Sequence, residues 1–186
     1  MGMPLAHRRF TVDEYHRMAE TGILAEDDRV ELLDGEIVEM SPIGPRHAAT
    51  VTRLEHLFHQ LVGDRAIVRG QNPVLLDGYS EPEPDIALVT PRADFYATEH
   101  PTPRDTLLVV EVADTSLKYD RHSKLPSYAR VGVPEVWLVD LTADRVERHR
   151  EPRGDAYADL QILGREATLT PLLLPEVAIR IGDLLG

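Results

Sequence analysis

The sequence contains no cysteine, and this absence excludes several kinds of chemistry at once. Disulfide frameworks, thiolate zinc sites and cysteine nucleophiles all need a residue that the chain lacks. Phosphate loops of the GxxxxGK[ST] type, GxSxG elbows and GxGxxG fingerprints are missing as well. A site in this chain must therefore depend on carboxylate, histidine and hydroxyl chemistry.

Long apolar runs are also absent. No run approaches the roughly 18 residues of a membrane span, and the first ten residues, MGMPLAHRRF, lack the apolar core of a signal peptide. We therefore expect a cytoplasmic protein with no membrane partner. The net charge of -12 opposes broad attraction to nucleic acid, although a local basic patch can act independently because salt screens charges over about 8 Å.

The length of 186 residues and the hydrophobic content of 42% suit one domain. A domain of this size buries roughly 70% of the surface of its unfolded chain. We expect a single domain spanning residues 1–186, with its core at about 11–150 and further strands in the C-terminal part, 151–186.

The N-terminal half combines helix signals with a hairpin signal. The capping-box spacing from Thr11 to Glu14 predicts a short helix that runs to about Glu20. The dipeptide Asp34-Gly35 separates two apolar-rich segments and predicts a two-residue hairpin turn. Apolar residues at helical spacing predict a helix over 51–62 that covers one sheet face. Short strands are predicted at 66–68, 73–76 and 86–89.

The C-terminal half is built around the run 107–112, which reads as a central strand that is apolar on both faces. A helix is predicted over about 117–131, but Pro126 removes a backbone hydrogen bond, so the helix should begin later or bend near Lys124. Further strands are predicted at 136–140, 145–150, 157–163 and 167–181, with a short turn at 184–185. The predicted fold class is α/β, with a mixed central sheet flanked by helices and an N-terminal hairpin.

A carboxylate interrupts the central strand at Glu111, and Asp85 stands at the start of the strand at 86–89. Alternation places Glu111 and Ala113 on the face opposite Val112, so the two acids meet if the strands pair. Such a pair indicates a site for a hard cation. The structural alternative is that Asp85 ends a proline-rich turn and Glu111 binds a buried arginine.

Lysine is rare: the chain has 18 arginines and two lysines, Lys118 and Lys124. A retained lysine suggests a site that needs a compact ammonium group, which can orient water or stabilise a developing phosphorane charge. Asp120, Lys124 and Tyr128 follow at four-residue steps and share one helical face. The alternative is an ordinary surface pair between Asp120 and Lys124, and for Lys118 a surface position is the better interpretation.

Several motifs occur together with consistent intervals: RVELLDGEI, PEPDIALV, LLVVEVADTS, YDRHSK and SYARVGVPEVWLVD. From about Thr11 to Asp140 the chain resembles the Uma-type family of restriction endonucleases, a branch of the PD-(D/E)XK nuclease superfamily. The resemblance implies a restriction-endonuclease-like core that hydrolyses DNA phosphodiester bonds with Mg²⁺ or Mn²⁺. The C-terminal 40 or so residues match the family pattern only loosely.

Carried over residue by residue, the resemblance makes Asp85 the acid of the PD element, Glu111 the second acid and Glu31 a third acid. The lysine expected two residues after the second acid is replaced by Ala113, and its role passes to Lys124. The Val112 carbonyl joins the implied metal ligands. Three further residues are expected near the substrate: His47, Asp120 and His122.

Other histidines and aromatic residues have plainer interpretations. His56 and His59 suit a solvated helical face better than a metal site, because no third ligand is in view. Tyr128 and Trp137 suit core packing at least as well as a role in the site. A homodimer is compatible with an enzyme that cuts both strands, but the sequence shows no interface. A non-catalytic metal- or partner-binding module that keeps the nuclease fold remains the alternative function.

Overall fold

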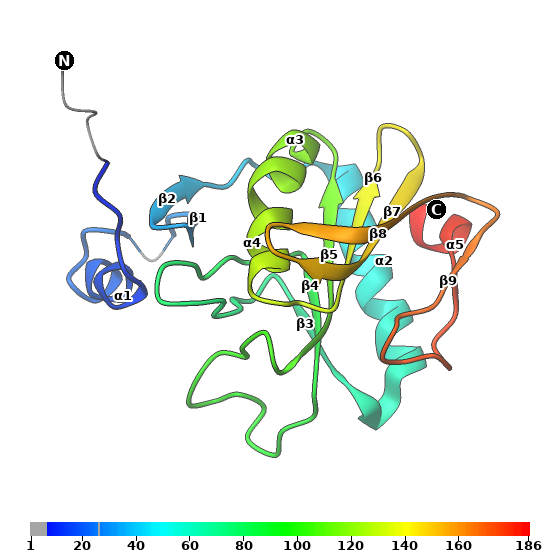
Figure 1. Cartoon of the computed structure of the whole chain (residues 1–186), viewed down its shortest axis with the longest axis horizontal. Coiled ribbons are helices and arrows are strands. Elements are labelled where there is room, and N and C mark those ends of the chain that lie inside the picture. Colours follow the sequence, from blue (N-terminus) through cyan, green and yellow to red (C-terminus); the bar gives the residue numbers. More distant parts are fainter. Residues whose placement is uncertain (1–6, 26) are drawn as a thin grey trace.

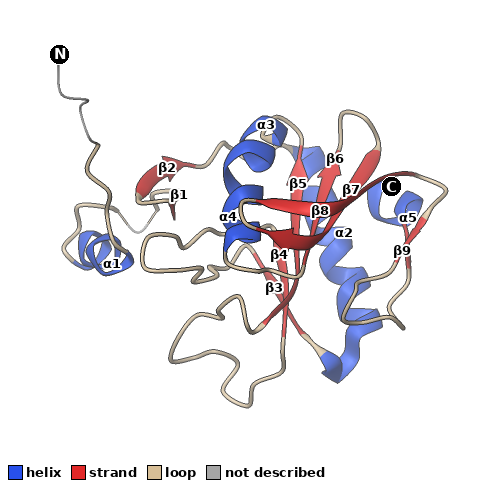
Figure 2. Cartoon of the chain, viewed as in Figure 1, coloured by secondary structure: helices blue, strands red, loops and turns tan. Residues whose placement is uncertain are grey.

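The central element of the computed structural model, which describes residues 7–25 and 27–186, is a six-stranded sheet. Residues 1–6, where the chain was expected to lack a signal core, lie outside the described part. The sheet has the order β3-β4-β5-β6-β7-β8 and is mixed, because β5 and β6 are parallel and all other neighbours are antiparallel. Figure 2 shows these strands crossing the molecule. Their bounds are Ile67–Gly70, Ile86–Val89, Thr106–Ala113, Glu135–Asp140, Arg145–Arg153 and Ala156–Gly164.

Two apolar clusters cover the two faces of this sheet, as the alternation in β5 dictates. Leu108, Val110 and Val112 pack against α2 (Pro45–Val62), whose buried face includes Leu54 and Phe58. The opposite cluster brings strand residues against the segment that ends in α4 (Leu125–Arg130). Figure 1 shows α2 and α4 on either side of the central strands. The predicted α/β class and the covering helix are confirmed.

The N-terminal elements follow their local signals. Helix α1 (Val12–Glu20) starts with both hydrogen bonds of the capping box, between Thr11 and Glu14. The hairpin joins β1 (Val30–Leu33) to β2 (Glu36–Glu39). At Gly35, φ is +79° and a Cβ atom would lie 2.5 Å from the Arg9 Cβ, so this turn requires glycine.

The helix after β5 is continuous but changes its winding. It runs through α3 (Leu117–Tyr119), a π-helical turn η2 (Asp120–Lys124) and α4. The Leu125 amide donates to the Asp120 carbonyl, five residues back. Pro126 has no amide hydrogen and cannot make the α-helical bond to His122, so the wider turn accommodates it. The predicted irregularity near Lys124 is thus a π-helical turn rather than a late start or a sharp bend.

Two predicted strands are wrong. Residues 73–76 form no strand, since their amides bond to three separate carbonyls: Val74 to Pro82, Leu75 to Pro101 and Leu76 to Ser80. Residues 167–181 form no single strand either, because prolines at 171 and 175 interrupt them. This segment instead contributes the two-residue strands β9 (Thr168–Leu169) and β10 (Ile179–Arg180), which pair with each other.

The remaining elements are short. A 3₁₀ turn, η1 (Gly63–Arg65), follows α2, and the chain closes with helix α5 (Ile181–Leu185), where a turn was predicted. Helix α5 buries Ile181, Leu184 and Leu185 in the cluster that contains α2. Within the described ranges, no helix combines the length and the apolar character needed to cross a bilayer.

Candidate active site

Asp85 and Glu111 come from neighbouring strands, as the sequence argument required. Strands β4 and β5 are antiparallel, with Ile86 opposite Val110. Continuing this register by one step places Asp85 opposite Glu111, so both side chains leave the same face of the sheet. The Val112 amide donates to Asp85 Oδ2 at 2.8 Å and fixes the position of that carboxylate.

Lys124 lies between two buried acids. Its Nζ is 3.1 Å from Glu31 Oε2 and 3.2 Å from Glu111 Oε1, and it donates to the Glu83 carbonyl at 3.4 Å. Its side chain is only 7% exposed, so the surface-pair interpretation of this lysine is wrong. Burial by itself lowers the pKa of Lys124, but the charges of Glu111 and Glu31 more than offset this and raise it. The amine is therefore a cation at neutral pH.

Glu31 reaches the site from the hairpin and is fully engaged there. Tyr119 donates its hydroxyl to Oε1 at 3.1 Å, and the Glu83 amide donates to Oε2 at 3.0 Å. Together with Lys124, these donors use both carboxylate oxygens. Glu31 therefore connects the hairpin to the helix after β5 and holds the ammonium group in place.

Glu111 is less fully engaged than Glu31. Tyr128 donates its hydroxyl to Oε1 at 2.6 Å, and Lys124 contacts the same oxygen. Among the described residues, none donates a hydrogen bond to Oε2. Burial raises the pKa of Glu111 to about 8, against the opposing effect of Lys124. The predicted alternative, in which Glu111 binds a buried arginine, is not what the structure shows.

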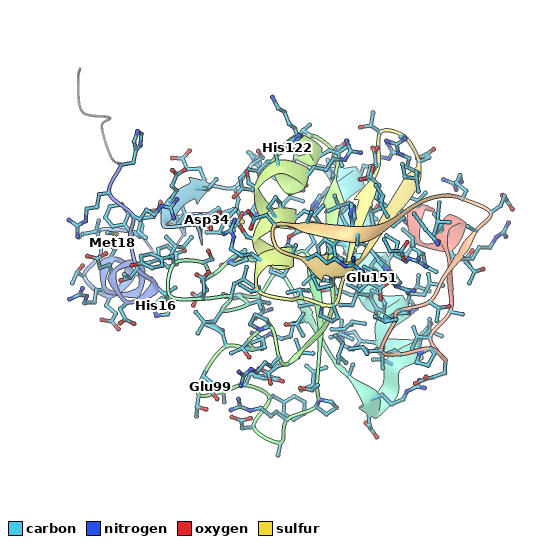
Figure 3. All side chains as sticks on the ribbon, in the orientation of Figure 1. His16, Met18, Asp34, Glu99, His122 and Glu151 are labelled. Carbon is cyan, nitrogen blue, oxygen red and sulfur yellow. The ribbon has the colours of Figure 1, made fainter. Side chains whose placement is uncertain are left out.

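The three residues expected beside the substrate occupy different depths. His47 Nε2 lies 3.1 Å from Asp85 Oδ2, and this hydrogen bond raises the pKa of His47. Asp120 is buried, accepts from the Ser116 hydroxyl at 2.7 Å, and has its pKa raised to about 6 by burial. His122, labelled in Figure 3, is exposed. Its ring bonds to the Lys118 carbonyl.

The four acids, Lys124 and both histidines line one pocket of about 720 Å³. Its walls come from the hairpin, the loop between β2 and α2, the end of β5 and the helix that follows. The sequence-predicted members are Glu31, His47, Asp85, Glu111, Val112, Asp120, His122 and Lys124. The structure thus brings every predicted site residue to a single place, although they come from four separate parts of the chain: the hairpin, α2, the position before β4, and β5 with the helix after it.

Sequence reasoning missed the hydroxyl donors that position the acids. Tyr128 was weighed as a core residue, although it follows Lys124 by one helical turn, which was the available signal. Nothing in the local sequence pointed to Tyr119. Gln71, whose amide lies 3.5 Å from Asp85 Oδ1, was also missed.

The donor set fits a hard cation of the kind that keeps several waters. Among the residues that the structure describes, Asp85 Oδ1 has only the long contact with Gln71, and none donates a hydrogen bond to Glu111 Oε2. Mg²⁺ is usually held by one or two carboxylates together with waters and substrate phosphates. Across residues 7–25 and 27–186, no group of three or more histidine or acidic side chains is arranged to hold a metal, so a closed cage is not formed. The contact seen at Val112 is through its amide, and a role for its carbonyl stays a prediction.

Comparison with solved structures identifies the class of fold. A crystal structure from Anabaena variabilis, described as a "putative nuclease belonging to DUF820", superposes with a TM-score of 0.72 at 17% identity. The alignment covers 95% of this chain and 97% of that one. At this identity the likeness establishes the fold alone.

The family follows from the sequence match. Residues 12–182 match the family described as "Uma2: Putative restriction endonuclease", and the chain belongs to this family. No curated protein matches the chain. The predicted family and fold class are confirmed, and the match extends through the C-terminal part where the resemblance was loosest.

Proposed function

We propose that the chain is a metal-dependent endonuclease that hydrolyses DNA phosphodiester bonds. Family and fold support a nuclease-type hydrolase. The observation that carries the proposal is the convergence of Asp85, Glu111 and Lys124 in one pocket, with the ammonium 3.2 Å from the second acid.

Asp85 and Glu111 are the residues that would hold Mg²⁺ or Mn²⁺. Each keeps one oxygen that is not committed to a short hydrogen bond, while the other is fixed by the Val112 amide or the Tyr128 hydroxyl. When bound, the metal supplies Lewis acidity to a phosphoryl oxygen and lowers the pKa of a bound water. The fixed oxygens keep both carboxylates in position before substrate arrives.

Lys124 acts as a hydrogen-bond donor in this proposal. Because neighbouring acids keep it charged, it cannot accept a proton from water, but it can orient a water molecule and stabilise negative charge on phosphorus oxygens. Glu31 holds the ammonium group and takes no direct part in the reaction. Lys124, on the helix, thereby supplies the ammonium group that Ala113, on the strand, cannot supply.

The alternative is a non-catalytic module that keeps the nuclease fold and binds a metal or a partner. The net charge of -12 favours it. So does the lack of a ready three-ligand metal group in the described part of the chain. The position of Lys124 favours the enzyme, because its ammonium lies beside Glu111 in the same pocket, where it can stabilise charge that develops on a phosphoryl group.

Cleavage assays separate the two functions. Plasmid, single-stranded and branched DNA are incubated with Mg²⁺, Mn²⁺ or EDTA, using wild type, Glu111→Ala and the control Glu36→Ala, which changes an exposed acid of the hairpin. We expect cleavage by wild type and by the control, and none by Glu111→Ala or with EDTA. Equal cleavage by wild type and Glu111→Ala would show contamination and contradict the proposal.

Metal binding is tested separately by calorimetry. Asp85→Ala should bind Mn²⁺ at least tenfold more weakly than wild type, because one of two carboxylates is gone. Unchanged affinity would remove Asp85 from the metal site.

A further inference from the structure

The reactive groups lie deep in their pocket. The side chains of Glu111, Lys124 and Asp85 are 3%, 7% and 13% exposed. Reacting atoms must approach to about 3–3.5 Å, so a phosphodiester has to enter the pocket and cannot react from its mouth.

The size of the pocket limits what can enter. Its volume of about 720 Å³ lies within the roughly 300–1,000 Å³ of small-molecule sites. A B-form duplex is much wider, since its major groove alone measures about 12 Å. A pocket of this volume has room for a short piece of one strand but not for a paired duplex.

The walls of the pocket offer surfaces that bases can use once they are unstacked. Val38, Met40 and Ile43 line it from β2 and the following loop, while Tyr119 and His122 line it from the helix. Aromatic side chains stack on the faces of unpaired bases without sequence preference. Apolar side chains beside them can shield those faces from water. In a duplex the faces of the bases are stacked on one another, so the pocket wall would meet mainly the phosphate backbone.

The charge around the pocket also disfavours a duplex. Seven acidic side chains line it, against three lysines and arginines, and one of these three, Lys124, is buried among acids. The exposed cations at its edge are Arg29 and Lys118. Duplex DNA carries one negative charge per ~1.7 Å of axis and a single strand about half that density, so a pocket with this excess of acids repels a duplex more strongly.

We propose that DNA enters this site as an unpaired strand, with one or two nucleotides inside the pocket, so that the substrates are single strands, flaps or unpaired loops. This inference rests on the proposed nuclease function. Entry from a paired duplex requires base pairs to open first, and that cost is smallest where the strand is already unpaired.

The test compares three end-labelled DNAs of the same sequence: a single strand, a full duplex and a duplex with a central unpaired loop. With Mg²⁺ or Mn²⁺, kcat/KM should be at least tenfold higher on the single strand than on the full duplex, and cuts in the third DNA should map to the loop. Cleavage of the full duplex at an equal or higher rate would overturn the inference.

A matched pair of variants tests the apolar wall. Ile43→Ser changes a residue that is 38% exposed at the pocket, and Ile162→Ser changes one that is 56% exposed on β8, outside it. Fluorescence anisotropy of a labelled single strand in Ca²⁺ should show at least threefold weaker binding for Ile43→Ser and unchanged binding for Ile162→Ser. Equal affinities for the two variants would contradict a role for this wall.

The same binding assay separates the two proposals. If wild type cleaves none of the three DNAs faster than Glu111→Gln, the nuclease function fails, but anisotropy still compares wild-type binding of single strand and duplex. Tighter binding of the single strand would support the inference, and equal or tighter binding of the duplex would overturn it.

Discussion

Two buried carboxylates on neighbouring strands of the sheet differ in how their charge is compensated. Glu135 on β6 is fully buried and accepts from the Trp137 indole at 2.7 Å, the Arg150 guanidinium at 2.9 Å and the Leu172 amide. Glu111 on β5 is 3% exposed and has one hydroxyl donor and an ammonium that it shares with Glu31.

Under the proposed nuclease function, the difference separates an acid that stabilises the fold from one that takes part in the reaction. Burying a charge costs several kcal/mol unless partners offset it. Arg150 and two further donors offset the cost at Glu135. At Glu111 the offset is incomplete, which is why burial raises its pKa to about 8. Glu111 should therefore contribute little to stability and Glu135 little to activity.

The largest expected effect comes from exchanging each acid for glutamine in a separate variant. Glu111→Gln should lower kcat/KM by about 10³-fold or more and leave the free energy of unfolding unchanged or higher. Glu135→Gln should lower the free energy of unfolding by about 3 kcal/mol, because Arg150 loses its charged partner, and change kcat/KM by less than threefold. Cleavage assays and urea denaturation measure both. Equal destabilisation by the two variants would invalidate the comparison.

Replacing the cation beside each of the two carboxylates should give the next largest effect. Lys124→Met should lower kcat about 10²-fold and destabilise the fold by about 3 kcal/mol, because the buried Glu31 loses its cation. Arg150→Met is the control: it should destabilise comparably and leave kcat of the folded protein unchanged. Loss of kcat in both variants would mean that the activity change follows from destabilisation.

Much of the fold could be predicted because its signals are local. Asp34-Gly35 specifies the hairpin turn by itself, and the apolar run of β5 identifies a central strand. Residues 73–76 were misread because apolar composition resembles a strand even where the amides bond to scattered loop carbonyls. The segment 167–181 was misread because its two prolines were given too little weight.

The site could be predicted only in part. A glutamate inside an apolar strand and a rare lysine on the next helix are visible in sequence, so Glu111 and Lys124 were found. Their donors were missed because they depend on tertiary packing: Tyr128 lies 17 positions from Glu111, and Tyr119 lies 88 from Glu31. The π-helical turn that carries Lys124 could be anticipated only as an irregularity caused by Pro126.

Removing the Tyr128 hydroxyl should have a smaller effect on kcat. Tyr128→Phe removes one donor to Glu111 and should lower kcat about tenfold, which corresponds to about 1.4 kcal/mol, while weakening Mn²⁺ binding in calorimetry. Trp137→Phe removes a donor to Glu135 and should change only the free energy of unfolding. Unchanged Mn²⁺ affinity in Tyr128→Phe would show that the hydroxyl does not position the acid.

The smallest expected effect is on the pH dependence of stability, and it comes from a residue outside the pocket. His149 on β7 is 6% exposed, with its ring 5.9 Å from that of Tyr157, and burial lowers its pKa. Glu147 opposes this shift and Arg121 adds to it. Below the unfolded pKa of about 6.5, the unfolded chain binds the proton first, so stability is lost as pH falls. His149→Gln should make urea midpoints between pH 7 and 5 less dependent on pH and leave cleavage unchanged; an unaltered pH dependence would mean that His149 does not determine it.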